Sequence, residues 1–302
     1  MKIIILFFVF PLFAFSSCNN ATPSERKVGH ATITTNDTLS FRNGYSEVNG
    51  IKMYYEIYGK GRPLVLIHGG GSTIQSSFGR IIPILAQHYE VIAPALQNHG
   101  RSGFRDIPET FEQDAKDVVT LLKNLGIDKT NFFGFSNGGT TALLIAIRHP
   151  EKVHKLVLAS ATYKRDGLIS GFFDMMNQST FSDMPQELKT AFLKVNTDTA
   201  KLHIMFEKDR DRMIEFKNIS DKEIKSITAP TLIINADEDV VRPEQAVELF
   251  HLIPNAHLAI FPGRHGEYIG EITTLKSDSK AYKFIMPMVE NFLDKPLKKR
   301  KK

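Results

Sequence analysis

Apolar and polar positions follow two different periods along this chain, and the alternation between the two periods predicts the fold. Short, continuous apolar runs bounded by turn residues are typical of strands that are buried on both faces of a parallel sheet. Between these runs, apolar residues recur every three or four positions, which is the spacing of a helix with one buried face. The predicted strands cover 63–68, 90–95, 131–135, 153–160, 231–235 and 258–261. The predicted helices cover 81–88, 111–125, 140–148, 243–252 and 284–292.

Strands and helices that alternate over most of a chain indicate an α/β fold with a mostly parallel central sheet and helices on both faces. A β-hairpin is expected in front of this pattern. Its strands are 45–48 and 51–58, joined by Asn49-Gly50, a dipeptide favoured in two-residue hairpin turns. In the last helix we expect the buried face to consist of Phe284, Ile285, Met288, Val289 and Phe292.

One region interrupts the alternation and predicts a helical cap. Residues 161–227 contain helical patches but no convincing buried strand, so we expect an insertion that covers the edge of the sheet. Its large apolar residues are expected mainly to pack against one another, with some facing a cleft beneath the cap. They are Phe172, Phe173, Met175, Met176, Phe181, Met184, Met205, Phe206 and Met213. The core then consists of 44–160 and 228–293.

Composition and charge restrict the classes of function. The chain has 302 residues, of which 42% are hydrophobic and 24% charged, as in an ordinary globular protein. The net charge is +5, and part of it lies in a basic tail at 294–302. We interpret this tail as a solvated end, with contact to an anionic membrane surface as the alternative. No basic patch interleaved with aromatic residues is present, so we expect no nucleic-acid partner. No metal-ligand spacing is apparent, and we expect neither a metal nor a cofactor.

The first residues have the pattern of an export signal. Lys2 precedes an apolar stretch at 3–15, which is shorter than the roughly 20 residues that span a bilayer. Cys18, the one cysteine of the chain, directly follows Phe15-Ser16-Ser17. This arrangement resembles the lipobox of bacterial lipoproteins, although Phe15 stands where leucine is usual. The resemblance implies a signal at 1–18, lipidation of Cys18 and a polar tether at 19–43 to an envelope membrane. An ordinary signal peptide with an incidental cysteine is the alternative, and either one places the protein outside the cytoplasm.

Candidate chemistry begins at Gly134-Phe135-Ser136-Asn137-Gly138, which lies between a predicted strand and a predicted helix. A G-x-S-x-G sequence at such a junction forms a sharp turn from which the serine hydroxyl projects. Glycines on both sides are required because side chains there would collide with the strand and the helix. The free N–H groups at the start of the helix suit a developing oxyanion. We therefore predict that Ser136 is a nucleophile.

A serine nucleophile needs a base and an acid, and the sequence offers candidates for both. His265 follows the last predicted strand in a glycine-bounded loop, and imidazole exchanges a proton near neutral pH. An acid must orient this imidazole and stabilise its charged form. Asp239 and Asp237 both follow the strand that ends near Asn235, so both are candidates. If Asp239 is the acid, Asp237 is expected to cap a turn.

The motifs together resemble the α/β-hydrolase fold family with a small helical cap, over about 45–292 of this chain. They are His68-Gly69-Gly70-Gly71, Asn98-His99-Gly100-Arg101-Ser102, the serine turn, Asn235-Ala236-Asp237-Glu238-Asp239 and Pro262-Gly263-Arg264-His265-Gly266. The order Ser, Asp, His is the one that this fold uses. The family places two apolar residues and a proline soon after its acid, which favours Asp239. The resemblance also implies an oxyanion hole formed by the backbone N–H groups of Asn137 and Gly70, with His68 and His99 in structural roles.

The resemblance implies a serine hydrolase of the esterase and lactonase type, acting on a small carboxylic ester, lactone or thioester through an acyl-enzyme. Hydrolysis of a C–C bond and perhydrolysis are possible on the same machinery. Epoxide hydrolases and haloalkane dehalogenases of this fold carry aspartate at the position of Ser136, so those activities are not expected. A binding protein of the same fold with little turnover is the alternative from another class.

Overall fold

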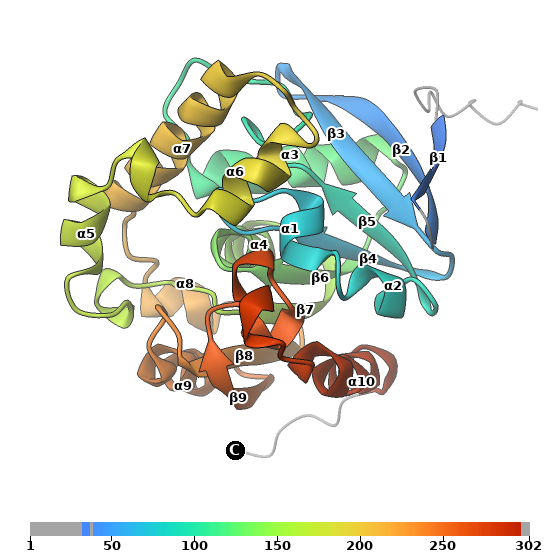
Figure 1. The fold of residues 1–302 in the computed structure, drawn as a ribbon. Helices are drawn as coiled ribbons and strands as arrows, with labels where there is room; N and C mark the ends of the chain where they lie inside the picture. Colours follow the sequence, from blue (N-terminus) through green and yellow to red (C-terminus); the bar gives the residue numbers. More distant parts are fainter. Residues whose placement is uncertain (1–31, 37–38, 297–302) are drawn as a thin grey trace, which may run out of the picture.

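A nine-stranded sheet forms the centre of the computed structural model, which describes residues 32–36 and 39–296. Cys18, the predicted signal and residues 297–302 of the basic tail lie outside these residues. The strands are β1 (Thr32–Asn36), β2 (Leu39–Val48), β3 (Ile51–Tyr58), β4 (Arg62–Ile67), β5 (Tyr89–Pro94), β6 (Thr130–Phe135), β7 (Val153–Ala159), β8 (Thr231–Glu238) and β9 (Ala256–Arg264). Their order in the sheet is β1-β2-β3-β5-β4-β6-β7-β8-β9 (Figure 1).

The predicted mostly parallel sheet is confirmed. Pairing is parallel from β5 through β4, β6, β7 and β8 to β9, and antiparallel from β1 to β3 and between β3 and β5. The parallel strands β4 and β6 are almost wholly buried, which explains their continuous apolar runs. Because the carboxyl ends of parallel strands share one edge of a sheet, the loops that follow β4, β6 and β8 come together there.

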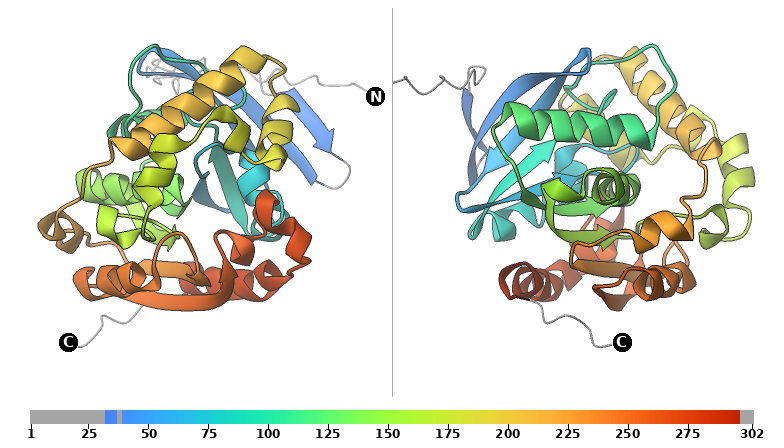
Figure 2. Two further views of the ribbon diagram at one scale, coloured as in Figure 1. Left: turned by 60° about the vertical axis from the view of Figure 1, so that its left-hand side comes forward. Right: turned by 180° about the vertical axis from the view of Figure 1, so that it is seen from behind.

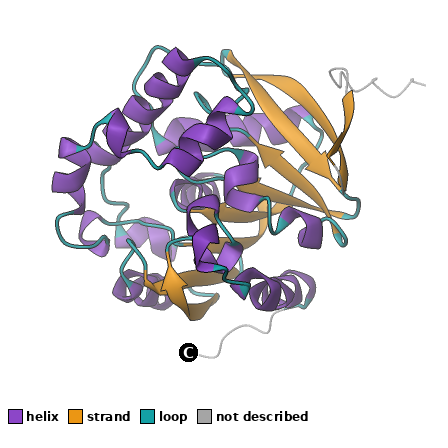
Figure 3. Cartoon of the chain, in the orientation of Figure 1, coloured by secondary structure: helices purple, strands orange, loops and turns teal. Residues whose placement is uncertain are grey.

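Helices cover both faces of the sheet (Figures 2 and 3). The helices are α1 (Ile74–Phe78), α2 (Ile82–Leu85), α3 (Phe111–Asn124), α4 (Asn137–Arg148), α5 (Phe172–Gln178), α6 (Gln186–Leu193), α7 (Thr199–Ile214), α8 (Asp221–Lys225), α9 (Pro243–Leu252) and α10 (Ala281–Asp294). Buried apolar residues of α4, α8 and α9, and most of those of α3, belong to one hydrophobic cluster, and those of α1, α2 and α10 belong to a second. Among the described residues, no helix combines the length and apolar character needed to cross a bilayer.

The predicted tether does not extend to residue 43. Residues 32–36 and 39–43 lie in β1 and β2, and only 19–31 and 37–38 of the proposed tether lie outside the described residues. The start of β2 could not be predicted from the sequence, because only one face of this strand is buried and its apolar residues are few. Phe41 is buried on that face, whereas neighbouring positions are polar and exposed.

The buried face of the last helix also differs from the prediction. Phe284 is 80% exposed, whereas the predicted Met288 is partly buried. The buried residues of α10 are Ile285, Met286, Val289, Phe292 and Leu293. Phe284 continues the apolar spacing of this helix one position beyond the face that the helix buries. Periodicity alone therefore could not exclude it.

The segment between β7 and β8 is helical, as expected for the cap, but its last helix belongs to the core. Helices α5 and α6 both pack against α7 above one end of the sheet (Figure 1). Helix α8 instead contacts α4 and α9, and Ile224 on α8 is buried in the main hydrophobic cluster. The apolar residues at the end of the insertion therefore return the chain to the core before residue 227.

Candidate active site

The serine turn has the geometry that its sequence predicts. Ser136 separates β6 from α4 and has a φ of 54° and a ψ of −123°. A side chain at Gly134 would overlap the backbone of Gly138, and one at Gly138 would overlap the carbonyl oxygen of Ile67. Both glycines are therefore required by the close approach of strand and helix. The turn holds the Ser136 hydroxyl at the carboxyl edge of the sheet.

The structure brings Ser136, His265 and Asp239 together. His265 follows β9, and its Nε2 lies 3.0 Å from Ser136 Oγ, while its Nδ1 lies 2.6 Å from Asp239 Oδ1. Asp237 points elsewhere, because its Oδ1 accepts a hydrogen bond of 2.8 Å from the Gly263 N–H. The geometry thus places Asp239 in the position of the acid. Asp237 lies within β8, where the pairing of β8 with β9 is irregular, so the expectation that it caps a turn is wrong.

Asp239 is held by groups that the sequence analysis did not identify. Its Oδ2 accepts a hydrogen bond of 2.5 Å from Ser160 Oγ, and its Oδ1 accepts one of 3.0 Å from the Val241 N–H. The hydroxyl of Tyr268 lies 2.5 Å from Ser160 Oγ. Ser160 follows β7 with a φ of 48°, which is rare for a residue with a side chain. The contacts of Ser160 and Tyr268 fix the carboxylate before any substrate binds.

The electrostatics of Asp239 and His265 favour an ionised carboxylate and a basic imidazole. Burial would raise the pKa of Asp239, but His265 outweighs this effect and holds the pKa below its usual value. Burial would lower the pKa of His265, but Asp239 outweighs it and raises the pKa. The His265 side chain is still 28% exposed, so its proton can exchange with groups in the site.

These shifts give a prediction for the pH dependence of turnover. Attack by Ser136 needs a neutral imidazole, and the pKa of His265 is raised above the ordinary 6.5. We therefore expect kcat/KM to fall as pH decreases through a midpoint above 6.5. Initial rates with an aryl ester between pH 5 and 9 measure this midpoint. A midpoint clearly below 6.5 would contradict the assignment of His265 as the base.

The residues proposed for the oxyanion hole lie side by side at the base of the site. In the loop after β4, the N–H of Gly69 donates to Ser77 Oγ at 3.3 Å, and the N–H of Gly71 donates to the carboxylate of Asp209. Among the described residues, the Gly70 N–H has no hydrogen-bond partner. A side chain at Gly70 would collide with the amide of Asn137, the first residue of α4. These positions fit the predicted pair of donors.

His68 and His99 have structural contacts, as expected. His68 is buried, its Nδ1 donates to the Gly69 carbonyl at 2.8 Å, and its Nε2 accepts the Leu96 N–H at 3.0 Å. Burial lowers the pKa of His68 to about 3, so it stays neutral. His99 is also buried, but its Nε2 lies 2.8 Å from Asp209 on the cap helix α7. No motif in the sequence predicts this pair, whose members lie 110 positions apart.

A cavity of about 370 Å³ opens above Ser136 and beneath the cap. Its walls contain Gly70, Asn137 and His265 from the core and a group of apolar cap residues. The cap residues that line it include Phe172, Met175, Met176, Met184, Phe206 and Met213. Most of the large apolar cap residues that were expected mainly to pack together therefore reach the cavity, because α5, α7 and the segment that precedes α6 all border it.

The fold and the site define the class: the chain has the α/β-hydrolase fold and carries the side chains of a serine hydrolase in hydrogen-bonded order. A family model described as the alpha/beta hydrolase fold matches residues 62–195, which supports membership of that family.

Known proteins similar to this chain are hydrolases. A 2-hydroxy-6-oxo-6-(2'-aminophenyl)hexa-2,4-dienoic acid hydrolase of Metapseudomonas resinovorans is 26% identical over 76% of this chain and 86% of its own length. The serine hydrolase BPHL of Homo sapiens is 29% identical over 74% of this chain and 79% of its own length. The solved structure of a serine hydrolase involved in carbazole degradation, the CarC enzyme, superposes with a TM-score of 0.68 at 24% identity, covering 84% of this chain and 98% of that one. These similarities support the conclusion that this chain is a hydrolase.

Proposed function

We propose that this protein is a serine hydrolase that cleaves a small carboxylic ester through an acyl-enzyme on Ser136. His265 takes the proton of Ser136 as the hydroxyl attacks the carbonyl carbon, and then donates it to the leaving alcohol. A water molecule activated by the same imidazole hydrolyses the acyl-enzyme and restores the serine. The observation that carries the proposal is the continuous set of hydrogen bonds from Asp239 through His265 to Ser136.

The cavity supports a short, apolar acyl group. Ligand cavities in proteins span roughly 300 to 1,000 Å³, so a cavity of about 370 Å³ lies near the small end of that range. Methionine and phenylalanine side chains form much of its wall, and such surfaces favour an aliphatic or aromatic group over a charged one. We therefore expect esters and lactones with small apolar acyl groups to be the better substrates.

Hydrolysis of a C–C bond is the second candidate, favoured by the relative from Metapseudomonas resinovorans. The compound in its name is an oxo-dienoic acid without an ester, so its hydrolysis breaks a C–C bond. A dienoate carries a carboxylate that needs a cation inside the cavity. Among the described residues, Arg210 lines the cavity, but its guanidinium lies 2.8 Å from Asp211. This pairing favours the ester over the dienoate.

A direct comparison of substrates tests the proposal. Purified protein is treated with a fluorophosphonate probe and assayed with p-nitrophenyl esters from acetyl to octanoyl and with a 2-hydroxy-6-oxo-hexadienoate. We expect rapid labelling, turnover of the short esters, and a lower kcat/KM for the dienoate. Higher kcat/KM for the dienoate would favour the second candidate. Resistance to the probe together with no turnover of any substrate would exclude a serine hydrolase and leave a binding protein.

We also propose that the protein is exported and lipid-anchored through Cys18 in a bacterial envelope. The proposal rests on the pattern of the first residues and on the position of this cysteine after Phe15-Ser16-Ser17. Cys18→Ala is expected to move the protein from the membrane fraction to the soluble fraction, because the thiol that carries the lipid is absent. Immunoblots of fractionated cells measure the shift. An unchanged distribution would contradict lipidation.

A further inference from the structure

The loop that carries Gly70 is held from two directions. On the core side, the Gly69 N–H donates to Ser77. On the cap side, the Gly71 N–H donates to the carboxylate of Asp209, which lies on α7, 138 positions further along the chain. The N–H groups on both sides of Gly70 are thus bound to the protein. The position of Gly70 therefore depends on both anchors, and one of them belongs to the cap.

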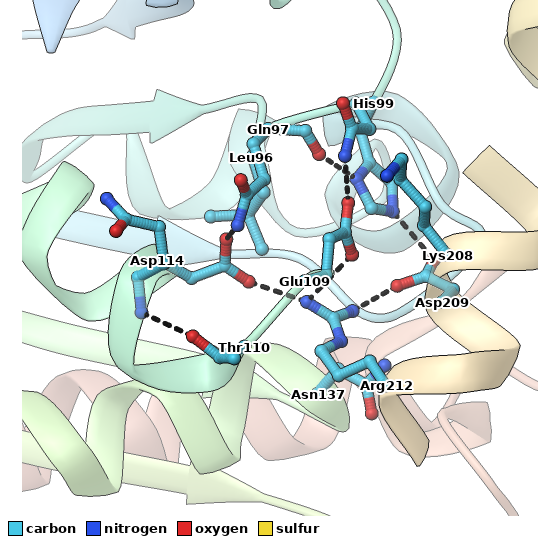
Figure 4. Close-up of polar contacts among 12 residues, drawn as sticks. Leu96, Gln97, His99, Glu109, Thr110, Asp114, Asn137, Lys208, Asp209 and Arg212 are labelled. Carbon is cyan, nitrogen blue, oxygen red and sulfur yellow. Dashed lines mark hydrogen bonds and ion pairs between the residues drawn. The ribbon is translucent and has the colours of Figure 1, made fainter. Parts of the chain in front are cut away.

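Asp209 is itself fixed by a buried charge network that joins the cap to the core (Figure 4). His99 Nε2 lies 2.8 Å from Asp209 Oδ2, and Arg212 donates to Asp209 Oδ1. Arg212 also binds Asp114 on α3 at 2.6 Å and lies 3.4 Å from Glu109. The side chain of Asp209 is 10% exposed and that of Arg212 is 1% exposed, so solvent screens these contacts little. Asp209 therefore has little freedom to leave the Gly71 N–H.

The charges of the network are compatible with an oxyanion nearby. A lone carboxylate beside the loop would repel a developing negative charge. Burial would raise the pKa of Asp209, but Arg212 and His99 hold it below the usual value, and the carboxylate is paired with both. Burial would lower the pKa of His99, but Asp209 outweighs it and raises the pKa to about 9. Asp209 is thus not a lone carboxylate: it lies between His99 and Arg212, and Arg212 also pairs with Asp114 and Glu109.

We infer that Asp209 is a positioning residue for the oxyanion hole, through which the cap orients the loop that carries Gly70. The inference rests on the proposed acyl-transfer function and extends it. Asp209 is part of the cavity wall, and its oxygens bind Gly71, His99 and Arg212, not Ser136 or His265. Its effect is expected on the transition state, where the oxyanion forms, and not on the binding of the ground-state ester.

The test uses Asp209→Asn and Asp209→Ala in the full chain, with Glu207→Gln as the matched control. Glu207 is an exposed acidic residue on the same helix. Active sites are counted by complete reaction with a fluorophosphonate, and kcat is expressed per titrated site. We expect Asp209→Asn to lower kcat by about 10-fold and Asp209→Ala by about 100-fold, with KM changed less than 3-fold, because loss of an oxyanion donor costs about 10² to 10³ in kcat. Glu207→Gln is expected to match the wild type.

A trifluoromethyl ketone separates positioning from loss of folded protein. This inhibitor forms a tetrahedral oxyanion with serine, so its Ki is expected to rise by the factor by which kcat/KM falls. If Asp209→Asn keeps the wild-type kcat per titrated site and the wild-type Ki, the inference is wrong although the hydrolase remains. A rise in KM with kcat unchanged would also overturn it, because Asp209 would then be part of the cavity wall alone. Failure of the proposed function is distinguishable, since the wild-type protein would then neither label nor turn over esters.

Discussion

Replacing Ser136 with alanine is expected to lower kcat for a short aryl ester by about 10⁵-fold to 10⁶-fold, to the level left by substrate binding and the oxyanion hole. The substitution removes Ser136 Oγ, which lies 3.0 Å from His265 Nε2. His265 then has no serine hydroxyl from which to accept a proton. Cα, Cβ and the backbone of the turn are retained, so the protein is expected to fold. Initial rates and labelling with a fluorophosphonate, measured on the same preparation, check the result.

Circular dichroism and the unfolding midpoint serve as controls for Ser136→Ala. Alanine keeps the conformation required of residue 136, and the midpoint is expected to stay close to that of the wild type. Ser102 provides a second control, because it is a buried serine in another loop whose hydroxyl donates to the Ala95 carbonyl at 2.6 Å. Ser102→Ala should still label. Residual activity of Ser136→Ala within 100-fold of the wild type would show that another group is the nucleophile.

The second large effect is expected at Asp239. Asp239→Asn retains the size of the side chain but removes the charge and reverses the hydrogen bond to His265 Nδ1, which stabilises the wrong imidazole tautomer. We expect kcat to fall by about 10⁴-fold. The midpoint of the pH profile should also move down, because Asp239 is the group that raises the pKa of His265. Both quantities come from one set of initial rates across pH.

Asp237→Asn is the matched control for Asp239→Asn. Asp237 lies two positions away, and its oxygen binds the Gly263 N–H at 2.8 Å, not the imidazole. Asparagine can accept the same hydrogen bond with its amide oxygen, so kcat is expected to stay within about 3-fold of the wild type. If Asp237→Asn lost activity and Asp239→Asn did not, the acid would have to be reassigned.

The parts of the fold and site that were predictable are those whose cause is local. The buried runs at β4 and β6 are visible because strands covered on both faces need apolar side chains at every position. The serine turn is visible because close packing permits only glycine at positions 134 and 138. Asp239 stood out from Asp237 through the Val240-Val241-Arg242-Pro243 sequence that follows it.

The parts that were missed depend on contacts between distant segments. Ser160 follows β7 and Tyr268 lies in a short turn after β9, and neither has a distinctive neighbourhood in the sequence. Asp209 and Arg212 look like an ordinary i,i+3 pair on an exposed helix. One clue was available: Asp114 lies one position before Ala115 on the apolar side of a predicted helix, where a buried carboxylate needs a cationic partner.

The backbone conformation of residue 136 couples the thermal stability of this protein to its catalytic activity. A side chain at a φ of 54° costs on the order of 1 to 3 kcal/mol, which the remaining contacts of the fold must offset. Glycine would relieve that cost and would delete the hydroxyl at the same time. Laboratory evolution that selects for heat resistance alone would therefore favour glycine at this position, which is inactive. A screen for a thermostable enzyme has to select for turnover in every round.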